Sequence, residues 1–199
     1  KALSDVSANE DAANATIDLS NVFNDVDDAN GSITKAATSS DASLVTAAVN
    51  GNVLTLDYQG DQSGTATITV TASSNGKTVS DVIDVTVSAV DDGPVTANAI
   101  SDLNAAEDAS NATIDLSNVF NDVDDANGSI TKTETSSDAS LVTATVTGNV
   151  LTLDFQGDQS GSSTITVTGT SNGKSAQNTF TVNVSAVNDI PKNLVLSDN

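Results

Sequence analysis

The sequence repeats itself with a period of 97 residues. Residues 4–94 align without a gap on residues 101–191, and 68 of the 91 aligned positions are identical. One run, Asn14–Lys35, recurs unchanged as Asn111–Lys132. A near-identical repeat of domain size is typical of a module copied in tandem, and such modules are more often spacers or binding units than catalysts. We predict one domain over residues 1–94, a second over 95–191, and the start of a further repeat over 192–199.

Polar and apolar residues alternate along each repeat, which is typical of half-buried β-strands. Tight-turn signals separate the alternating runs at Asn50-Gly51-Asn52 and Asn75-Gly76. In the first repeat we expect seven short strands, at 3–6, 16–19, 32–37, 43–49, 53–56, 66–71 and 82–87. Residues 19–23 could form a short helical turn, with Phe23 packed beneath it. Seven strands without helical periodicity predict an all-β fold, with an Ig-like antiparallel sandwich of two sheets in each domain.

The composition excludes several classes of function. The chain has 27 acidic residues against 6 lysines, no arginine, and a formal net charge of −21. Such a chain is unsuited to nucleic acid or to anionic lipid surfaces. It has no cysteine and no histidine, which removes thiolate metal sites and the commonest acid/base catalyst. We therefore predict a protein that is not an enzyme, binds no nucleic acid and does not insert directly into a membrane through this segment.

The acidic residues gather in three clusters per repeat, and no lysine is adjacent to them in the sequence. The clusters are Glu10-Asp11, Asp25–Asn30 and Asp91-Asp92, with counterparts at Glu107-Asp108, Asp122–Asn127 and Asn188-Asp189. Calcium prefers six to eight oxygen ligands from loop carboxylates, carbonyls and amides, and it would relieve the repulsion within such clusters. The loop is not an EF-hand, because the twelfth residue counted from Asp25 is Ala36 rather than a glutamate.

The order and spacing of these motifs resemble those of cadherin-like tandem repeats, which occur in bacterial surface adhesins. The resemblance covers both repeats and rests on Asn9-Glu10, Leu56-Asp57-Tyr58-Gln59, Asp122-Val123-Asp124, Asn127–Ile130 and the exit Ala186–Pro191. In that family, calcium bound between consecutive modules makes the array rigid. The resemblance therefore implies an all-β, cadherin-like sandwich and Ca²⁺ as the cofactor.

Carried over by position, the resemblance also implies the ligands. The complete site would use Glu10, Asp57, Asp91, Asp92, Asp122, Asp124 and Asn127, with Gln59 as a weaker contributor. Outer half-sites would use Asp25, Asp27 and Asn30 at one end, and Glu107, Asp154 and Asp189 at the other. Gln59, Gln156, Ser74 and Ser171 stand where the family carries carboxylates, so we expect one to three ions.

The remaining acidic and aromatic residues have structural interpretations. Asp41, Asp61, Asp138 and Asp158 occur in Gly/Ser/Gln-rich connections and are expected to form turns. Phe23 and Phe120 are expected in the core, and Tyr58 and Phe155 are expected to pack. The alternative for the acidic loops themselves is a solvated turn.

The prediction for the whole chain is a pair of calcium-rigidified extender modules of a long extracellular bacterial adhesin that mediates cell-surface adhesion. Its expected partners are neighbouring repeats of the same chain, together with a surface carbohydrate or another cell-surface protein. Two alternatives stay open. The chain could be a carbohydrate-binding or self-associating module, or an accessory domain of a secreted polysaccharide-degrading enzyme.

Overall fold

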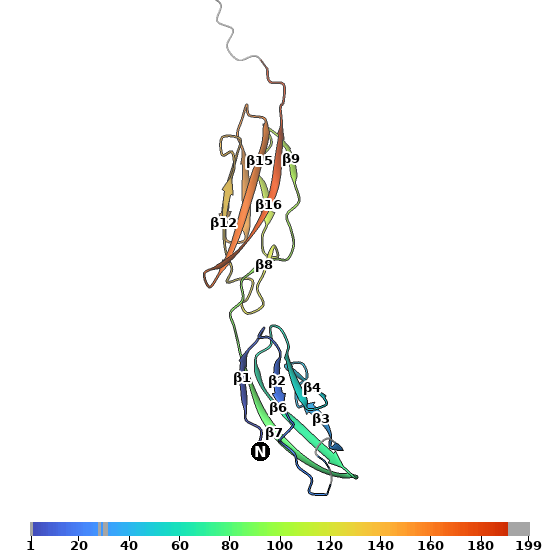
Figure 1. The fold of residues 1–199 in the computed structure, drawn as a ribbon. Coiled ribbons are helices and arrows are strands. Elements are labelled where there is room, and N and C mark those ends of the chain that lie inside the picture. Colours follow the sequence, from blue (N-terminus) through green and yellow to red (C-terminus); the bar gives the residue numbers. More distant parts are fainter. Residues whose placement is uncertain (1, 28, 30–31, 191–199) are drawn as a thin grey trace, which may run out of the picture. The chain divides into compact units, whose positions relative to one another are not determined.

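The computed structural model describes residues 2–27, 29 and 32–190 and divides the chain into two compact units (Figure 1). Unit 1 is Lys1–Val90 and unit 2 is Asp91–Asn199. The division falls four residues before the repeat boundary, because residues 91–96 make their contacts within unit 2 (described below). The expected repeat start at 192–199 lies outside the described residues. Among the described residues, no helix is long and apolar enough to cross a membrane.

Unit 1 is a sandwich of two sheets. One sheet has the order β1-β7-β6-β3 and the other has the order β2-β5-β4. Neighbouring strands are antiparallel, except that β1 runs parallel to β7. The strands are β1 (Val6–Asn9), β2 (Ala15–Asp18), β3 (Thr34–Ser39), β4 (Val45–Asn50), β5 (Val53–Tyr58), β6 (Gly64–Ser74) and β7 (Lys77–Ser88).

Unit 2 repeats this architecture and adds one small ribbon. Its sheets have the orders β9-β16-β15-β12 and β10-β14-β13, and β8 pairs with β11. The strands are β8 (Val95–Thr96), β9 (Leu103–Ala106), β10 (Ala112–Asp115), β11 (Phe120–Asn121), β12 (Thr131–Ser136), β13 (Val142–Thr147), β14 (Val150–Phe155), β15 (Gly161–Ser171) and β16 (Lys174–Ser185).

Each unit has its own core, built from alternate residues of facing strands. In β6, residues Ala66, Ile68, Val70 and Ala72 point inward while the threonines between them are at least partly exposed. Phe23 and Tyr58 join this core, as do Phe120 and Phe155 in unit 2. The predicted all-β sandwich and the packing of these four aromatic side chains are thus confirmed.

One local feature differs from the sequence interpretation, and a second agrees with it. The first strand of unit 1 is Val6–Asn9 rather than 3–6, because the backbone N–H of Leu3 donates to the Asp81 carboxylate instead of to a strand. Residues 19–22 form a single turn closed by a hydrogen bond from Val22 N–H to the Leu19 carbonyl (3.3 Å). The turn is followed by Phe23, whose side chain packs in the core and is 7% exposed.

Candidate metal site

Glu10 and its counterpart Glu107 are buried carboxylates at the exits of the two units. They are only 3% and 6% exposed. Glu10 Oε1 accepts the backbone N–H of Val90 (2.7 Å), and Glu107 Oε1 accepts that of Val187 (2.8 Å). Each carboxylate therefore holds the segment that follows the last strand of its unit. Two of the three glutamates in the chain therefore have the same structural role.

The acidic loop of unit 2 folds around Asp122, which is 5% exposed. Its Oδ1 atom accepts the backbone N–H groups of Asp124 and Asp125 (3.1 and 3.2 Å). Its Oδ2 atom is buried and has no hydrogen-bond partner among the described residues. A buried carboxylate oxygen without a donor is costly unless a cation satisfies it. The donor set, all oxygen, suits a hard cation such as calcium.

The connecting residues Asp91 and Asp92 pack onto this loop within unit 2. Asp92 N–H donates to Asp124 Oδ2 (2.6 Å), which fixes the backbone of Asp92 beside the loop. Asp91 accepts a hydrogen bond from Asn172 Nδ2 (2.5 Å) and forms an ion pair with Lys174 Nζ (3.3 Å). The hydrogen bond from Asn172, together with Lys174, lowers the pKa of Asp91.

The Lys174 contact is a feature that the sequence interpretation missed. No lysine is adjacent to the acidic clusters in the sequence, but the β15–β16 hairpin brings Lys174 to Asp91 from more than 80 residues away. Asp91 thus already has a cationic partner in the fold. It is a weaker candidate ligand than Asp122, whose Oδ2 has none.

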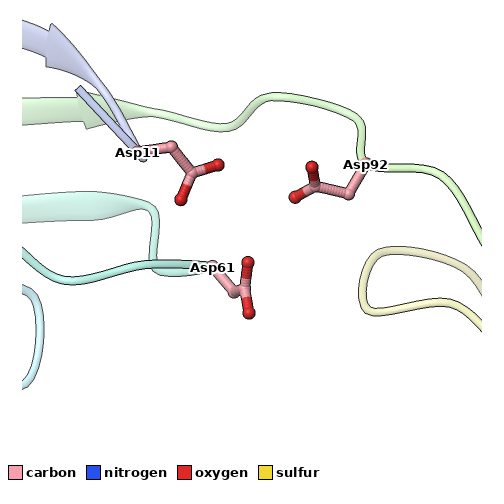
Figure 2. A group of neighbouring side chains, drawn as sticks. All are labelled: Asp11, Asp61 and Asp92. Atoms are coloured by element: carbon pink, nitrogen blue, oxygen red, sulfur yellow. The ribbon is translucent and has the colours of Figure 1, made fainter. Parts of the chain in front are cut away.

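Two carboxylates of unit 1, those of Asp11 and Asp61, lie close together in Figure 2. Each offers one oxygen within 4.8 Å of the other. Asp11 follows β1, and Asp61 lies in the β5–β6 loop. Asp11 and Asp61 both have positive φ (57° and 56°), and a Cβ at Gly60 would lie 3.4 Å from Asp11 Oδ1, so the two loops touch.

The sequence predicts a turn at Asp61, which its positive φ agrees with. It places Asp11 in an acidic cluster with Glu10, and neither residue is among the predicted ligands. The signal that the sequence does offer is their recurrence as Asp108 and Asp158. Asp158 has the same positive φ, 58°.

The other predicted ligands have varied surroundings. Asp25 is half-buried and accepts Asp27 N–H (3.0 Å), whereas Asp27, Asp57, Asp124, Asp154 and Asp189 are exposed and Asn127 is half-buried. Asn30 lies outside the described residues. Asp41 and Asp138 form the expected turns, since each accepts both the N–H and the hydroxyl of the serine two residues on.

The solved structures that align with this chain include cadherin and titin domains, at low sequence identity and low TM-score. The chain aligns with Drosophila N-cadherin EC1-4 at 15% identity and a TM-score of 0.47, covering 92% of this chain and 48% of that one. It aligns with the titin domains Z1Z2 in complex with telethonin at 11% identity and a TM-score of 0.37, covering 94% and 95%.

A third structure is the endo-fucoidan hydrolase MfFcnA4 from glycoside hydrolase family 107, at 17% identity and a TM-score of 0.39. The alignment covers 94% of this chain but only 28% of the hydrolase. No protein-family model and no curated protein matches the sequence. These likenesses are too distant to carry an argument, so the function has to be argued from the residues themselves.

Proposed function

We propose that the chain is a pair of non-catalytic, calcium-binding spacer modules from an extracellular adhesin. Calcium held by carboxylates at the module ends restricts movement of the connecting residues 91–97 and stiffens the array. The array then carries a distal adhesive region, which contacts a carbohydrate or protein on another surface, away from the cell. Neighbouring repeats of the same chain are the immediate partners.

The observation that carries the proposal is the buried Asp122 Oδ2, which has no hydrogen-bond donor among the described residues. The other oxygen of this carboxylate, Oδ1, already accepts two backbone N–H groups of the loop. A divalent cation would satisfy the unpartnered Oδ2. The neighbouring carboxylates of Asp11 and Asp61 in unit 1 supply further oxygens suited to calcium.

The charge of the molecule supports the same conclusion. With a formal net charge of −21, the folded state suffers strong self-repulsion, and bound divalent cations reduce it where the carboxylates are densest. Spacer function also fits a module that is copied almost unchanged, because no single copy needs a unique surface.

The test is thermal unfolding of the chain in excess EGTA and in millimolar calcium. A ligand that binds only the native state raises the midpoint by mass action. We expect a rise of several degrees in calcium, and we expect the double variant Asp122→Asn with Asp124→Asn to abolish it. Asparagine keeps an oxygen acceptor for the loop N–H groups, so this variant should unfold normally in EGTA.

The matched control is Glu134→Gln, which removes one negative charge outside the clusters and should leave the calcium effect intact. Equal unfolding midpoints in EGTA and in calcium would overturn the proposal. The acidic loops would then be solvated turns without a metal. If calcium still raised the midpoint of the double variant, the ion would be bound by carboxylates other than Asp122 and Asp124.

A further inference from the structure

The hairpin tip between β15 and β16, residues Ser171–Lys174, packs onto the acidic loop of unit 2. Ser171 Oγ donates a hydrogen bond to Asp125 Oδ2 (2.6 Å), and Asn172 Nδ2 donates to the same oxygen (2.8 Å). Asp125 is half-buried. Two donors on one carboxylate oxygen satisfy this charge within the fold, so charge-assisted hydrogen bonds join the tip to the loop.

The same tip also holds the connecting residue Asp91. Asn172 Nδ2 donates to Asp91 Oδ1 (2.5 Å), while Lys174 Nζ pairs with Asp91 Oδ2 (3.3 Å). An amide nitrogen carries two hydrogens, so Asn172 can bond Asp91 and Asp125 at once. The Lys174 and Asp91 side chains are 48% and 39% exposed, and an exposed ion pair contributes little alone. The amide of Asn172 is therefore the group of the tip that joins the connecting segment to the acidic loop.

The backbone of the connecting segment follows the same surface. Asp92 N–H donates to Asp124 Oδ2 (2.6 Å), and a Cβ at Gly93 would lie 3.0 Å from Lys174 Cβ. Glycine permits this close approach to the tip because it has no side chain. These contacts join groups of the protein alone, so they can form before any ion binds.

The charges of the segment and the loop oppose this arrangement unless donors offset them. Asp91 and Asp92 in the segment meet Asp124 and Asp125 in the loop, and carboxylates that lie close together repel one another. The tip offsets this repulsion with hydroxyl, amide and ammonium donors. A site whose carboxylates are already positioned loses less conformational freedom when a cation binds.

We propose that the hairpin tip 171–174 positions residues 91 and 92 on the acidic loop before calcium binds, with Asn172 as the positioning residue. The inference deepens the proposed calcium-binding function and rests on it for the second of two consequences. The first is that Asp92 stays on the loop in EGTA. The second is that calcium binds a preassembled site and then suppresses the residual opening of the segment.

The experiment follows amide hydrogen exchange at Asp92 in the full chain in excess EGTA. The Asp92 N–H should be protected in the unchanged protein, and Asn172→Gly should speed its exchange about tenfold, because two hydrogen bonds to carboxylates are lost. Glycine keeps the turn, since Asn172 has a φ of 47°. Ala97 N–H, which donates to the Val119 carbonyl (2.8 Å), is the reference and should exchange at an unchanged rate.

The matched control is Asn75→Gly, because unit 1 carries the identical tip Ser74–Lys77. This variant should leave exchange at Asp92 unchanged. The fluorescence of Tyr58, the only tyrosine in a chain without tryptophan, checks that unit 1 remains folded. A calcium titration followed by the NMR signal of the Asp124 amide should give a dissociation constant about tenfold larger in Asn172→Gly, and an unchanged one in Asn75→Gly.

Three exchange results would overturn the positioning role. They are an unprotected rate at Asp92 in EGTA, equal rates in Asn172→Gly and Asn75→Gly, and equal acceleration at Asp92 and Ala97, which reports only a general loss of stability in unit 2. An unchanged dissociation constant in Asn172→Gly would overturn preassembly of the site. If calcium leaves the Asp124 signal of the unchanged protein unmoved, the calcium proposal fails, while exchange in EGTA still decides the positioning role.

Discussion

At the scale of single residues, the short side chain of aspartate stabilises turns by accepting hydrogen bonds from residues two positions on. Asp41 and Asp138 each accept a serine hydroxyl at 2.6 Å and the N–H of the same serine at 3.0 Å. These bonds, the hydroxyl bond first, lower the pKa of both aspartates. The abundance of aspartate over glutamate therefore reflects turn formation as well as any metal binding.

Ser140→Ala tests this role through its pH dependence. A lowered folded-state pKa stabilises the fold above the unfolded pKa of about 3.9, and this contribution is lost as the pH falls through the folded value. We expect Ser140→Ala to lower the unfolding midpoint of unit 2 at pH 7 and to have a smaller effect at pH 2. Ser43→Ala should reproduce the pattern in unit 1. A midpoint loss that is the same at both pH values would contradict the assignment.

At the scale of elements, the sequence predicts the strands well because their signals are local. Alternating Thr and Val or Ile in β6, and the turn residues Asn75 and Gly76 with positive φ (49° and 76°), specify the long β6–β7 hairpin without help from elsewhere. The small strands β8 and β11 could not be predicted. Residues 120–121 form a strand only when residues 95–96 lie beside them, as the identical residues 23–24 show.

The candidate site divides in the same way. Asp122 could be predicted, since the spacing of its loop is visible in the sequence. Two other contacts could not be predicted: the Lys174–Asp91 ion pair and the approach of Asp61 to Asp11. Each joins residues that are far apart in the sequence and become neighbours only in the folded sandwich. Contacts of this kind carry no periodic signal along the chain.

Glu107→Ala tests how far the exit segment depends on a buried carboxylate. Removing the acceptor leaves the Val187 N–H without its partner, a loss of about 1–3 kcal/mol if that group remains buried. We expect a lower midpoint for unit 2 in EGTA, where calcium plays no part. Glu107→Gln retains an oxygen acceptor and should recover most of the loss. If both variants behave alike, the charge rather than the hydrogen bond is what the unit needs.

At the scale of the whole molecule, the two units should unfold as separate cooperative bodies, because each has its own core. Leu56 and Leu153 are equivalent and fully buried, so replacing either with alanine should cost its own unit about 2–5 kcal/mol. In EGTA we expect Leu56→Ala to shift the transition seen by Tyr58, and Leu153→Ala to shift only the remaining circular-dichroism transition. One joint transition that moves with both variants would show the units to be coupled.

The two repeats diverge most in strand β7 and its counterpart β16, and this divergence disfavours mispairing of strands between the units. None of the seven positions in Thr78–Asp84 is identical to its counterpart in Ser175–Thr181. Within their own units, Ile83 pairs with Ile68 and Phe180 with Ile165, both in the core. If β16 paired with β6 instead, Phe180 would have to fit a space shaped for Ile83, and overpacking of this kind costs about 1–3 kcal/mol. Neighbouring near-identical modules are prone to exchange strands during folding, and the divergence of this strand penalises pairing of β16 with β6.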